Sequence, residues 1–396
     1  MKPLFATSLS LVSALGRGTA PAFEALRAGR GGLRRNDFLD STLDTWIGRV
    51  EGIEADAAGD QSGKFSDYRM QRIAQAGLVA DDFSEAVAHA RDRHGAKRIG
   101  VFLGTSSAGM LQGELAYRTR RPGPGALPEG LVFRDSFNMY APAAFVRAQL
   151  GLQGPAAVVS TACSSGAKVF ASAARAIEAG LCDAAVVGGV ETLCFTTLHG
   201  FTSLELLSRE PCRPCDPERG GISLGEGAAY VLLEKKDAAG NGLALLGYGE
   251  SADAHHMSTP HPEGLGAALA MRAALGRAGL APADIGYINL HGTGTRNNDA
   301  AEDAGVFSVV GSAVPCSATK GYTGHTLGAA GAIEAVLTLL CLREGYLPGT
   351  LNARSVDPVI RSQILLEGRS ASLEHALSNS FGFGGNNCSL VFGRSN

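Results

Sequence analysis

Aromatic and charged residues are scarce in this sequence. Aromatic residues make up 6% of the 396 positions, with a single tryptophan, and charged residues make up 18%. The formal net charge is -3, so neither sign is in large excess, and nothing predicts a protein that binds nucleic acid or a membrane surface. No stretch has the length and uniform apolarity of a bilayer-spanning helix, so we expect no membrane span.

The eight cysteines lack the close spacing of a disulfide framework. They are scattered along the chain, at positions 163, 182, 194, 212, 215, 316, 341 and 388. Such scatter in a long chain favours a reducing compartment, and we expect a cytoplasmic protein. The N-terminal segment LFATSLSLVSALG faintly resembles a secretory signal, but three serines interrupt it, so we predict a strand leading into a helix near 22–28.

Glycine and apolar residues, by contrast, are abundant. The 53 glycines and the 45% of hydrophobic residues indicate a globular protein with many turns. A length of 396 residues is enough for more than one ordinary domain, or for one large domain built from two halves. We divide the chain into residues 1–240 and 241–396, with residues 241–252 as the join.

The first of two similar regions lies in the N-terminal half. A β-branched run at 154–161 predicts a buried strand, a helix is expected over 163–178, and a second buried strand follows at 183–189. This order predicts a parallel βαβ unit. The segment PCRPCDPERGG at 211–221 is predicted to be a turn-rich surface loop.

The second region repeats this plan in the C-terminal half. A strand at 284–292 ends in a polar loop rich in glycine and threonine, and a helix is expected over 327–343. Residues 374–379 and 388–392 are typical of closing strands around the loop SFGFGGNN. The fold class predicted from both regions is α/β.

Cys163 lies in STACSSG, where a buried strand meets a helix. Amides at a helix N-terminus favour a negative charge on the sulfur, and small neighbours let a substrate approach. These features predict an acyl-accepting nucleophile. The alternative is a buried cysteine that behaves as a small hydrophobic residue, which is how we interpret most of the other seven.

His291 directly follows the strand YINL, in the segment HGTGTRNND. Open α/β sheets place their chemistry at the carboxyl ends of strands, so His291 is a candidate site residue. Thr293 and Thr295 offer hydroxyl groups in a loop otherwise lined by glycine. The alternative is an exposed histidine in a turn.

His325 lies in TKGYTGHTLGAAGAIEAV, at the start of the second helix. Lys320 comes five residues earlier and Glu334 nine residues later. A structural ion pair is the simpler interpretation of Lys320 and Glu334, but such a pair can also fix the orientation of a histidine.

The segment NSFGFGGNN at 379–387 places Phe381 and Phe383 among three glycines. Glycine lets the backbone approach a ligand closely, so this loop is a candidate part of the site. The alternative is a turn that ends a strand and carries two core phenylalanines.

Taken together, these segments resemble the β-ketoacyl-[acyl-carrier-protein] synthases of the chain-elongating kind. The similar motifs are TACSSG at Cys163, HGTGT at His291, KGYTGHTLGAAG at 320–331 and NSFGFGG near the end, with RPCDPERGGISLGEGAA at 213–229 as a further block. The resemblance spans nearly the whole chain. It implies the thiolase-like fold, with two similar halves in five α-β-α-β-α layers, and a dimer.

The resemblance also implies a reaction, the decarboxylative Claisen condensation of an enzyme-bound acyl group with malonyl-acyl-carrier protein, in fatty acid or specialised polyene or polyketide synthesis. Cys163 would accept the acyl group, and His291 and His325 would donate hydrogen bonds to the malonyl thioester carbonyl. Lys320 and Glu334 would support the histidines. The amides of Cys163 and Phe383 would form the oxyanion hole.

Binding roles follow from the same resemblance. Thr293 and Thr295 would contact the phosphopantetheine arm, which arrives on the carrier protein, so no cofactor of the enzyme's own is expected. Phe381 and Phe383 would contact the substrate, Phe383 as a gate. Ala108, in GTSSAGM, would form the floor of the acyl pocket. The positions expected to dock the acidic carrier protein are Arg69, Arg72 and Arg213.

Several departures and rival functions can be weighed on the motifs. A thiolase would carry a second cysteine where FGFGG stands, and chain-initiating or chalcone-type synthases use a Cys-His-Asn set, whereas GHT at 324–326 supplies a second histidine. A non-catalytic chain-length or scaffold subunit of a condensing-enzyme heterodimer would lack the nucleophile, whereas Cys163 is present here. Cys212 and Cys215 form a C-x-x-C pair where the family usually has an aromatic residue in place of Cys215, but no further ligands stand at a suitable spacing, so no metal is predicted.

Overall fold

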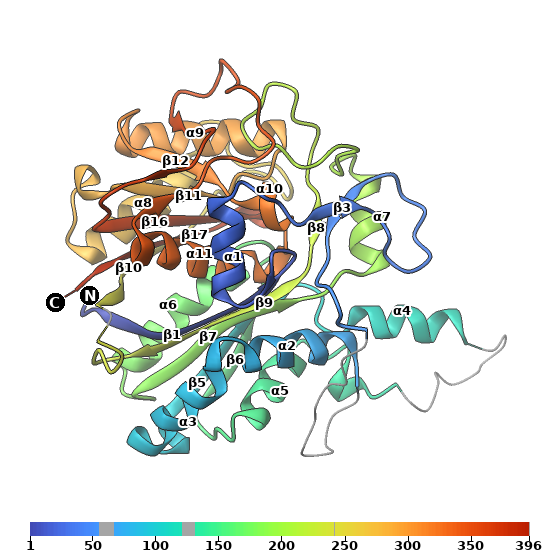
Figure 1. Ribbon diagram of the computed structural model, residues 1–396, viewed down its shortest axis with the longest axis vertical. Coiled ribbons are helices and arrows are strands. Elements are labelled where there is room, and N and C mark those ends of the chain that lie inside the picture. The colour runs from blue at the N-terminus through green and yellow to red at the C-terminus, as the bar shows by residue number, and fades with distance from the viewer. Residues whose placement is uncertain (55–66, 121–130, 241, 396) are drawn as a thin grey trace.

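The computed structural model describes residues 1–54, 67–120, 131–240 and 242–395. Figure 1 shows five layers: outer helices, a sheet, central helices, a second sheet and outer helices again. The helices of these layers are α2 (Arg69–Val79), α3 (Phe83–His94) and α5 (Ala141–Gln149) on one outer face, α6 (Ser165–Glu178) and α11 (Ala330–Glu344) in the centre, and α8 (Leu265–Ala278) and α9 (Arg296–Val310) on the other outer face.

The two halves of the chain have the same strand topology. In the N-terminal half the spatial order is β1 (Leu4–Ser13), β9 (Gly227–Glu234), β7 (Ala184–Glu191), β5 (Ile99–Gly104) and β6 (Ala156–Val159). In the C-terminal half it is β10 (Leu243–Ala252), β17 (Asn386–Arg394), β16 (His375–Gly382), β11 (Tyr287–Leu290) and β12 (Pro315–Ala318), with β14 (Gln363–Ile364) beyond. In each half the second strand of this order is antiparallel to both its neighbours, and the strands beyond it run parallel. This match confirms the predicted pair of similar halves.

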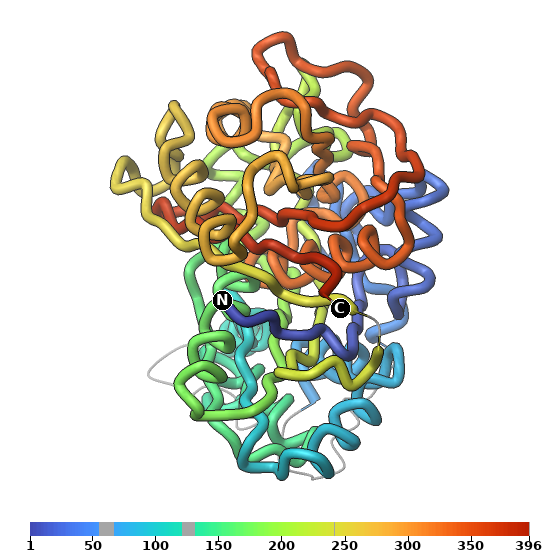
Figure 2. Tube along the Cα trace, turned by 90° about the vertical axis from the view of Figure 1, so that its left-hand side faces the viewer, coloured from blue at the N-terminus to red at the C-terminus, as the bar shows by residue number. Residues whose placement is uncertain are grey.

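The halves meet where β1 pairs with β10, Leu4 opposite Leu245 and Phe5 opposite Ala244. The predicted join at 241–252 is therefore itself largely a strand, β10. Figure 2 shows the two halves one above the other, with both termini at the level where they meet. Shorter elements complete the fold: α1 (Thr19–Arg27), α4 (Met110–Arg118), α7 (Phe195–Ser203), α10 (Lys320–Thr323), β2 (Gly16–Arg17), β3 (Leu33–Arg35), β4 (Trp46–Gly48), β8 (Leu224–Gly225), β13 (Tyr346–Leu347) and β15 (Arg369–Ser370).

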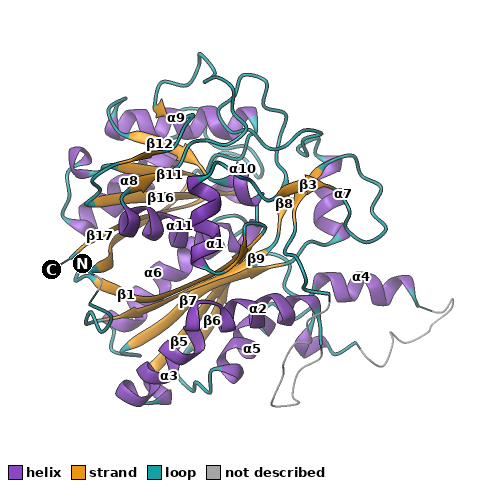
Figure 3. Cartoon of the chain, viewed as in Figure 1, coloured by secondary structure: helices purple, strands orange, loops and turns teal. Residues whose placement is uncertain are grey.

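The central layer explains the apolar composition. Residues 330–342 of α11 are all buried, as expected for a helix covered on every side. Helix α6 packs beside it, so the two helices separate the sheets (Figure 3). No helix among the described residues is long and apolar enough to cross a bilayer.

Two details of the predicted secondary structure differ in the folded chain. β6 and β7 are parallel, as the βαβ prediction requires, but β5 lies between them. Helix α9, which follows the loop at 291–295, was not predicted. Its buried side carries Asp299, Glu302 and Asp303 in place of the apolar stripe that reveals a helix in a sequence. These carboxylates accept hydrogen bonds from loop amides, which compensates for their burial.

The prediction of a surface loop at 211–221 is wrong. Six of its eleven residues are buried: Cys212, Pro214, Cys215, Asp216, Arg219 and Gly221. Arg219 donates to Asp357 at 2.6 Å, and Asp216 accepts the amide of Arg354 at 2.7 Å. Charged groups with distant partners therefore hold the segment against the C-terminal half, which its turn-rich composition does not reveal.

Glu191 connects the two halves beside the central layer. It ends β7 and is completely buried. Its carboxylate accepts the amides of Ser106 at 2.7 Å, Ser107 at 2.9 Å and Gly328 at 2.8 Å. Ser106 and Ser107 belong to the N-terminal half and Gly328 to the C-terminal half, so one side chain satisfies donors from both.

We expect Glu191→Ala to lower the free energy of unfolding by about 3 kcal/mol or more, because three buried amides lose their acceptor at roughly 1 kcal/mol or more each. Urea unfolding monitored by circular dichroism measures the change. The matched control is Glu178→Ala, at an exposed position of α6, which should stay within about 0.5 kcal/mol. Equal stability of the two variants would contradict this role of Glu191.

Candidate active site

Cys163 lies in a tight turn between β6 and α6, and 7% of its surface is exposed. The preceding residue, Ala162, has a left-handed φ of 52°. Gly382 of the closing loop passes directly over the turn, since a Cβ there would lie 3.1 Å from the Cys163 amide nitrogen and 2.9 Å from the Thr161 carbonyl oxygen. Only glycine permits this approach.

Burial raises the pKa of the Cys163 thiol to about 11, although the charge of Lys320 and the backbone amides of Phe383 and Cys163 act in the opposite direction. The sequence predicted that helix amides would favour the thiolate. In the folded protein, desolvation outweighs that effect, so the resting group is a thiol.

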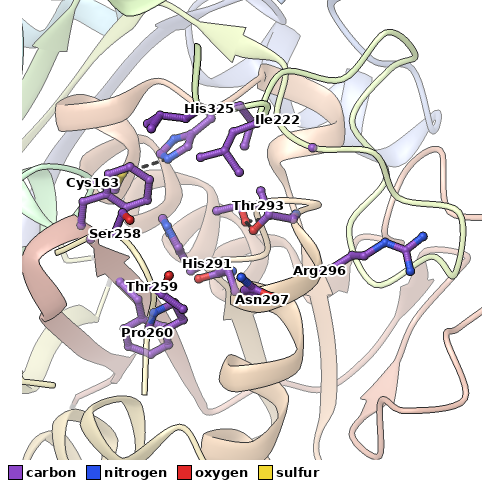
Figure 4. Close-up of a pocket in the computed structure, with 18 of the residues that line it drawn as sticks. Cys163, Ile222, Ser258, Thr259, Pro260, His291, Thr293, Arg296, Asn297 and His325 are labelled. Atoms are coloured by element: carbon purple, nitrogen blue, oxygen red, sulfur yellow. Dashed lines mark hydrogen bonds between the residues drawn. The ribbon is translucent and has the colours of Figure 1, made fainter. Parts of the chain in front are cut away.

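His325 contacts the nucleophile. Its Nε2 lies 3.0 Å from Cys163 Sγ, and Figure 4 draws this contact. Its Nδ1 accepts the amide hydrogen of Leu327 at 3.2 Å. Because an amide only donates, the neutral ring carries its proton on Nε2, and that N–H points toward the sulfur.

His291 also presents an Nε2–H donor, but here a lysine rather than a backbone amide occupies Nδ1. Its Nδ1 lies 3.1 Å from Lys320 Nζ, and an ammonium group only donates, so the proton of the neutral ring is on Nε2. The rings of His291 and His325 are 5.3 Å apart between centroids. Burial and the charge of Lys320 hold the pKa of both histidines well below the usual value, which keeps the rings neutral.

Lys320 and Glu334 lie behind the histidines and are both buried. Lys320 donates to Glu334, to the His291 carbonyl oxygen and to the His291 ring. Burial raises the pKa of Glu334 to about 7, against the opposing effect of Lys320. The pair fixes the orientation of His291, as the sequence suggested.

A cavity of about 450 Å³ joins these groups to the surface. Its walls include seven residues singled out in the sequence: Cys163, His291, Thr293, Thr295, His325, Phe381 and Phe383. The hydroxyls of Thr293 and Thr295 lie 2.9 Å apart. Phe201 also lines the cavity, and its ring lies 5.9 Å from that of Phe383 between centroids, so the two side chains pack together.

Other predicted residues lie elsewhere. Ala108 is buried and is not part of the cavity wall, and its place in an acyl pocket stays a prediction. The structure does not support Arg69 as a docking residue, because its side chain is 9% exposed and is paired with Glu226 and Glu54. The Nε of Arg69 donates to Glu226 at 2.9 Å. The sequence did not reveal this burial, because Glu226 lies 157 residues away from Arg69.

Two functional carboxylates on α9 were missed. Glu302 accepts the amides of His291 at 2.7 Å and Gly292 at 2.8 Å, and Asp299 accepts that of Thr293 at 3.0 Å. They hold the loop that carries His291. Their spacing of three residues, directly after a glycine-rich loop, is the signal that could have revealed them.

Cys163, His291 and His325 offer ligand atoms within 4.8 Å of one another, a distance that suits a metal ion. The electrostatics do not favour a cation. The ammonium of Lys320 lies 3.1 Å from His291, and both histidine Nε2 atoms carry protons. The arrangement is suited to stabilising an anion at the cavity end.

Comparison with known proteins agrees with this geometry. Residues 6–239 match the family described as beta-ketoacyl synthase, N-terminal domain, and residues 244–354 match the corresponding C-terminal domain. The chain is 33% identical over 410 residues to 3-oxoacyl-[acyl-carrier-protein] synthase 2 of Vibrio cholerae, and the match covers 98% of each chain.

Solved structures extend the likeness to the fold. A ketosynthase in complex with its chain length factor from Xenorhabdus doucetiae is similar at 37% identity and a TM-score of 0.89, over 100% of this chain and 98% of that one. A beta-ketoacyl synthase from Burkholderia phymatum is similar at 30% identity and a TM-score of 0.86, over the whole of both chains. This chain therefore belongs to the β-ketoacyl synthase family of acyltransferases, with the thiolase-like fold.

Proposed function

We propose that the protein condenses an acyl group held on Cys163 with a malonyl group on acyl-carrier protein, with loss of carbon dioxide. The observation that carries this proposal is the convergence of one thiol and two neutral imidazole N–H donors at the end of a single cavity. A non-catalytic scaffold role is not favoured, because it would make no use of this arrangement.

The first step is acyl transfer. The sulfur of Cys163 attacks the thioester carbonyl of the acyl carrier, and the thiol proton leaves with the carrier's pantetheine sulfur. The backbone N–H groups of Cys163 and Phe383 both interact with the Cys163 sulfur. They are therefore suited to donate hydrogen bonds to the oxyanion that forms on the carbonyl carbon bound to this sulfur. His325 does not serve as the base, since its Nδ1 is occupied by the Leu327 amide and its Nε2 is already protonated.

The second step is decarboxylation and condensation. The malonyl thioester oxygen accepts the Nε2–H groups of His291 and His325, which stabilise the enolate formed as carbon dioxide leaves. The enolate carbon then attacks the Cys163 thioester, and the cysteine sulfur departs with the electron pair. No cofactor of the enzyme's own takes part in this scheme, because phosphopantetheine arrives on the carrier.

We also propose that the protein works as a dimer in the cytoplasm, with a second copy or with a related subunit. Strand β6 is the edge of the N-terminal sheet and is half-buried along its length. Tyr117 and Phe133 expose 57% and 67% of their surface on segments of the same half. An apolar edge strand of this kind is suited to pairing with another chain. The buried free cysteines are consistent with a reducing compartment.

Carrier docking by Arg72 and Arg213 remains part of the proposal. Their side chains are 24% and 16% exposed, and among the described residues Arg72 pairs with Asp67 and Arg213 with Glu218.

Replacing the nucleophile tests the function directly. We expect Cys163→Ala and Cys163→Gln to abolish condensation, because no thioester can form. The Gln variant should retain malonyl decarboxylation, since its amide imitates the acylated sulfur. Product mass and carbon dioxide release measure the two activities. Cys182→Ala, at a buried position outside the cavity, is the matched control and should condense normally. Full condensation by Cys163→Ala would refute the assignment.

Removing one imidazole separates the two steps. We expect His291→Ala or His325→Ala to slow decarboxylation by about 100- to 1000-fold, the usual effect of losing one oxyanion donor. Acylation of Cys163, followed by intact-protein mass, should suffer less. A variant that decarboxylates normally but no longer forms the acyl-enzyme would reverse the roles proposed here.

Ala108 tests where the acyl chain lies. If the chain extends past this residue, Ala108→Phe should keep short-acyl condensation and lose long-acyl condensation. Ala108 has a left-handed φ of 45°, so Ala108→Gly is the control that tolerates the backbone and adds no bulk. The measurement is the mass of the products that each variant forms from a panel of acyl-carrier thioesters. The two variants are compared once they are shown to be equally stable. Identical chain-length profiles would place Ala108 outside the acyl channel.

A further inference from the structure

One cation in the cavity wall forms no ion pair within the part of the chain that the structure describes. The charged side chains of the wall are Glu205, Arg219, Asp253 and Arg296. Arg219 is buried between Asp357 at 2.6 Å and Asp299 at 3.5 Å. Arg296, in contrast, forms no hydrogen bond or ion pair with any residue that the structure describes, and only its more distant charge acts on Asp357, whose pKa it helps to lower. Figure 4 shows its side chain extending away from Cys163 and the histidines.

The loop that carries His291 leads to this cation. His291 is 1% exposed and Thr293 6%, Thr295 is half-buried, and Arg296 is exposed. All four line the cavity, so the loop forms a polar track from the reacting groups to the entrance. A ligand that follows this track with its thioester at Cys163 has its far end near Arg296.

Backbone donors lie beside the guanidinium. Arg296 is the first residue of α9, a helix of 15 residues. Within the described part of the chain, the amides of Arg296 and Asn297 have no acceptor. Unpaired amides at the positive end of a helix, next to a planar guanidinium, form a set of donors that matches a phosphate group.

We infer that Arg296 binds the phosphate of the phosphopantetheine arm. This inference rests on the proposed function, which brings that arm into the cavity. The arm ends in a phosphodiester with a single negative charge, and an unpaired arginine in the wall of the entrance offers two parallel N–H donors to it. Arg296 thus makes the protein bind phosphorylated pantetheine more tightly than unphosphorylated pantetheine, independently of the carrier protein.

Binding measurements test the inference without any need for turnover. Calorimetry with 4'-phosphopantetheine and with pantetheine should give tighter binding of the phosphorylated compound by about 10- to 100-fold, the usual effect of a hydrogen bond to a charged group. Arg296→Met should remove this difference, and Arg296→Lys should retain part of it as a point charge. Arg30→Met, at an exposed arginine outside the cavity, should leave it intact.

Kinetics with three malonyl thioesters distinguish the possible partners. With Arg296→Met, the KM for malonyl-phosphopantetheine and for malonyl-carrier protein should rise by a similar factor, while KM for malonyl-pantetheine and kcat stay unchanged. A KM rise confined to malonyl-carrier protein would assign Arg296 to the carrier protein and overturn the inference. An equal KM rise for all three thioesters would also overturn it, because the phosphate would then make no difference. Absence of condensation by the unsubstituted protein would reject the proposed function, and the binding difference would still decide the role of Arg296.

Discussion

The site depends on a buried ammonium group. Lys320 has no exposed side-chain surface, so its charge requires partners within the protein. Glu334 of α11 supplies the counter-charge, and the backbone and ring of His291 accept the remaining hydrogen bonds. Because the ammonium can only donate, it determines which nitrogen of His291 carries the proton. A single electrostatic requirement therefore fixes the tautomer of one histidine and helps to keep both neutral.

The reacting groups come from both halves of the chain. Cys163 follows a strand of the N-terminal sheet, whereas both histidines belong to the C-terminal half. They meet because α6 and α11 pack against each other between the sheets. Glu191 reinforces the junction by accepting amides from both sides. Each half on its own would carry either a thiol or the imidazoles, and the chemistry needs both.

Hydrogen bonding to carboxylates gives the His291 loop its shape. Glu302 and Asp299 accept four loop amides, and burial raises the pKa of Glu302 to about 7. Loops with this much glycine are costly to order, so the fixed acceptors of α9 replace the regular pairing that a strand would provide. The closing loop is held differently, since Gly384 donates to the Met257 carbonyl oxygen at 2.7 Å.

The sequence by itself determined which residue types stand at the site and in what order. Cys163, His291, His325, Lys320 and Glu334 were all identified, because short motifs with small residues and glycine carry their own signal. It also determined the α/β class and the two similar halves, since strand and helix patterns are local. Tertiary structure decided the rest. The burial of Arg69 depends on Glu226, 157 residues away, and the raised pKa of Cys163 depends on how completely other segments cover it. Burial and distant pairing are properties of the packed chain, and no local pattern contains them.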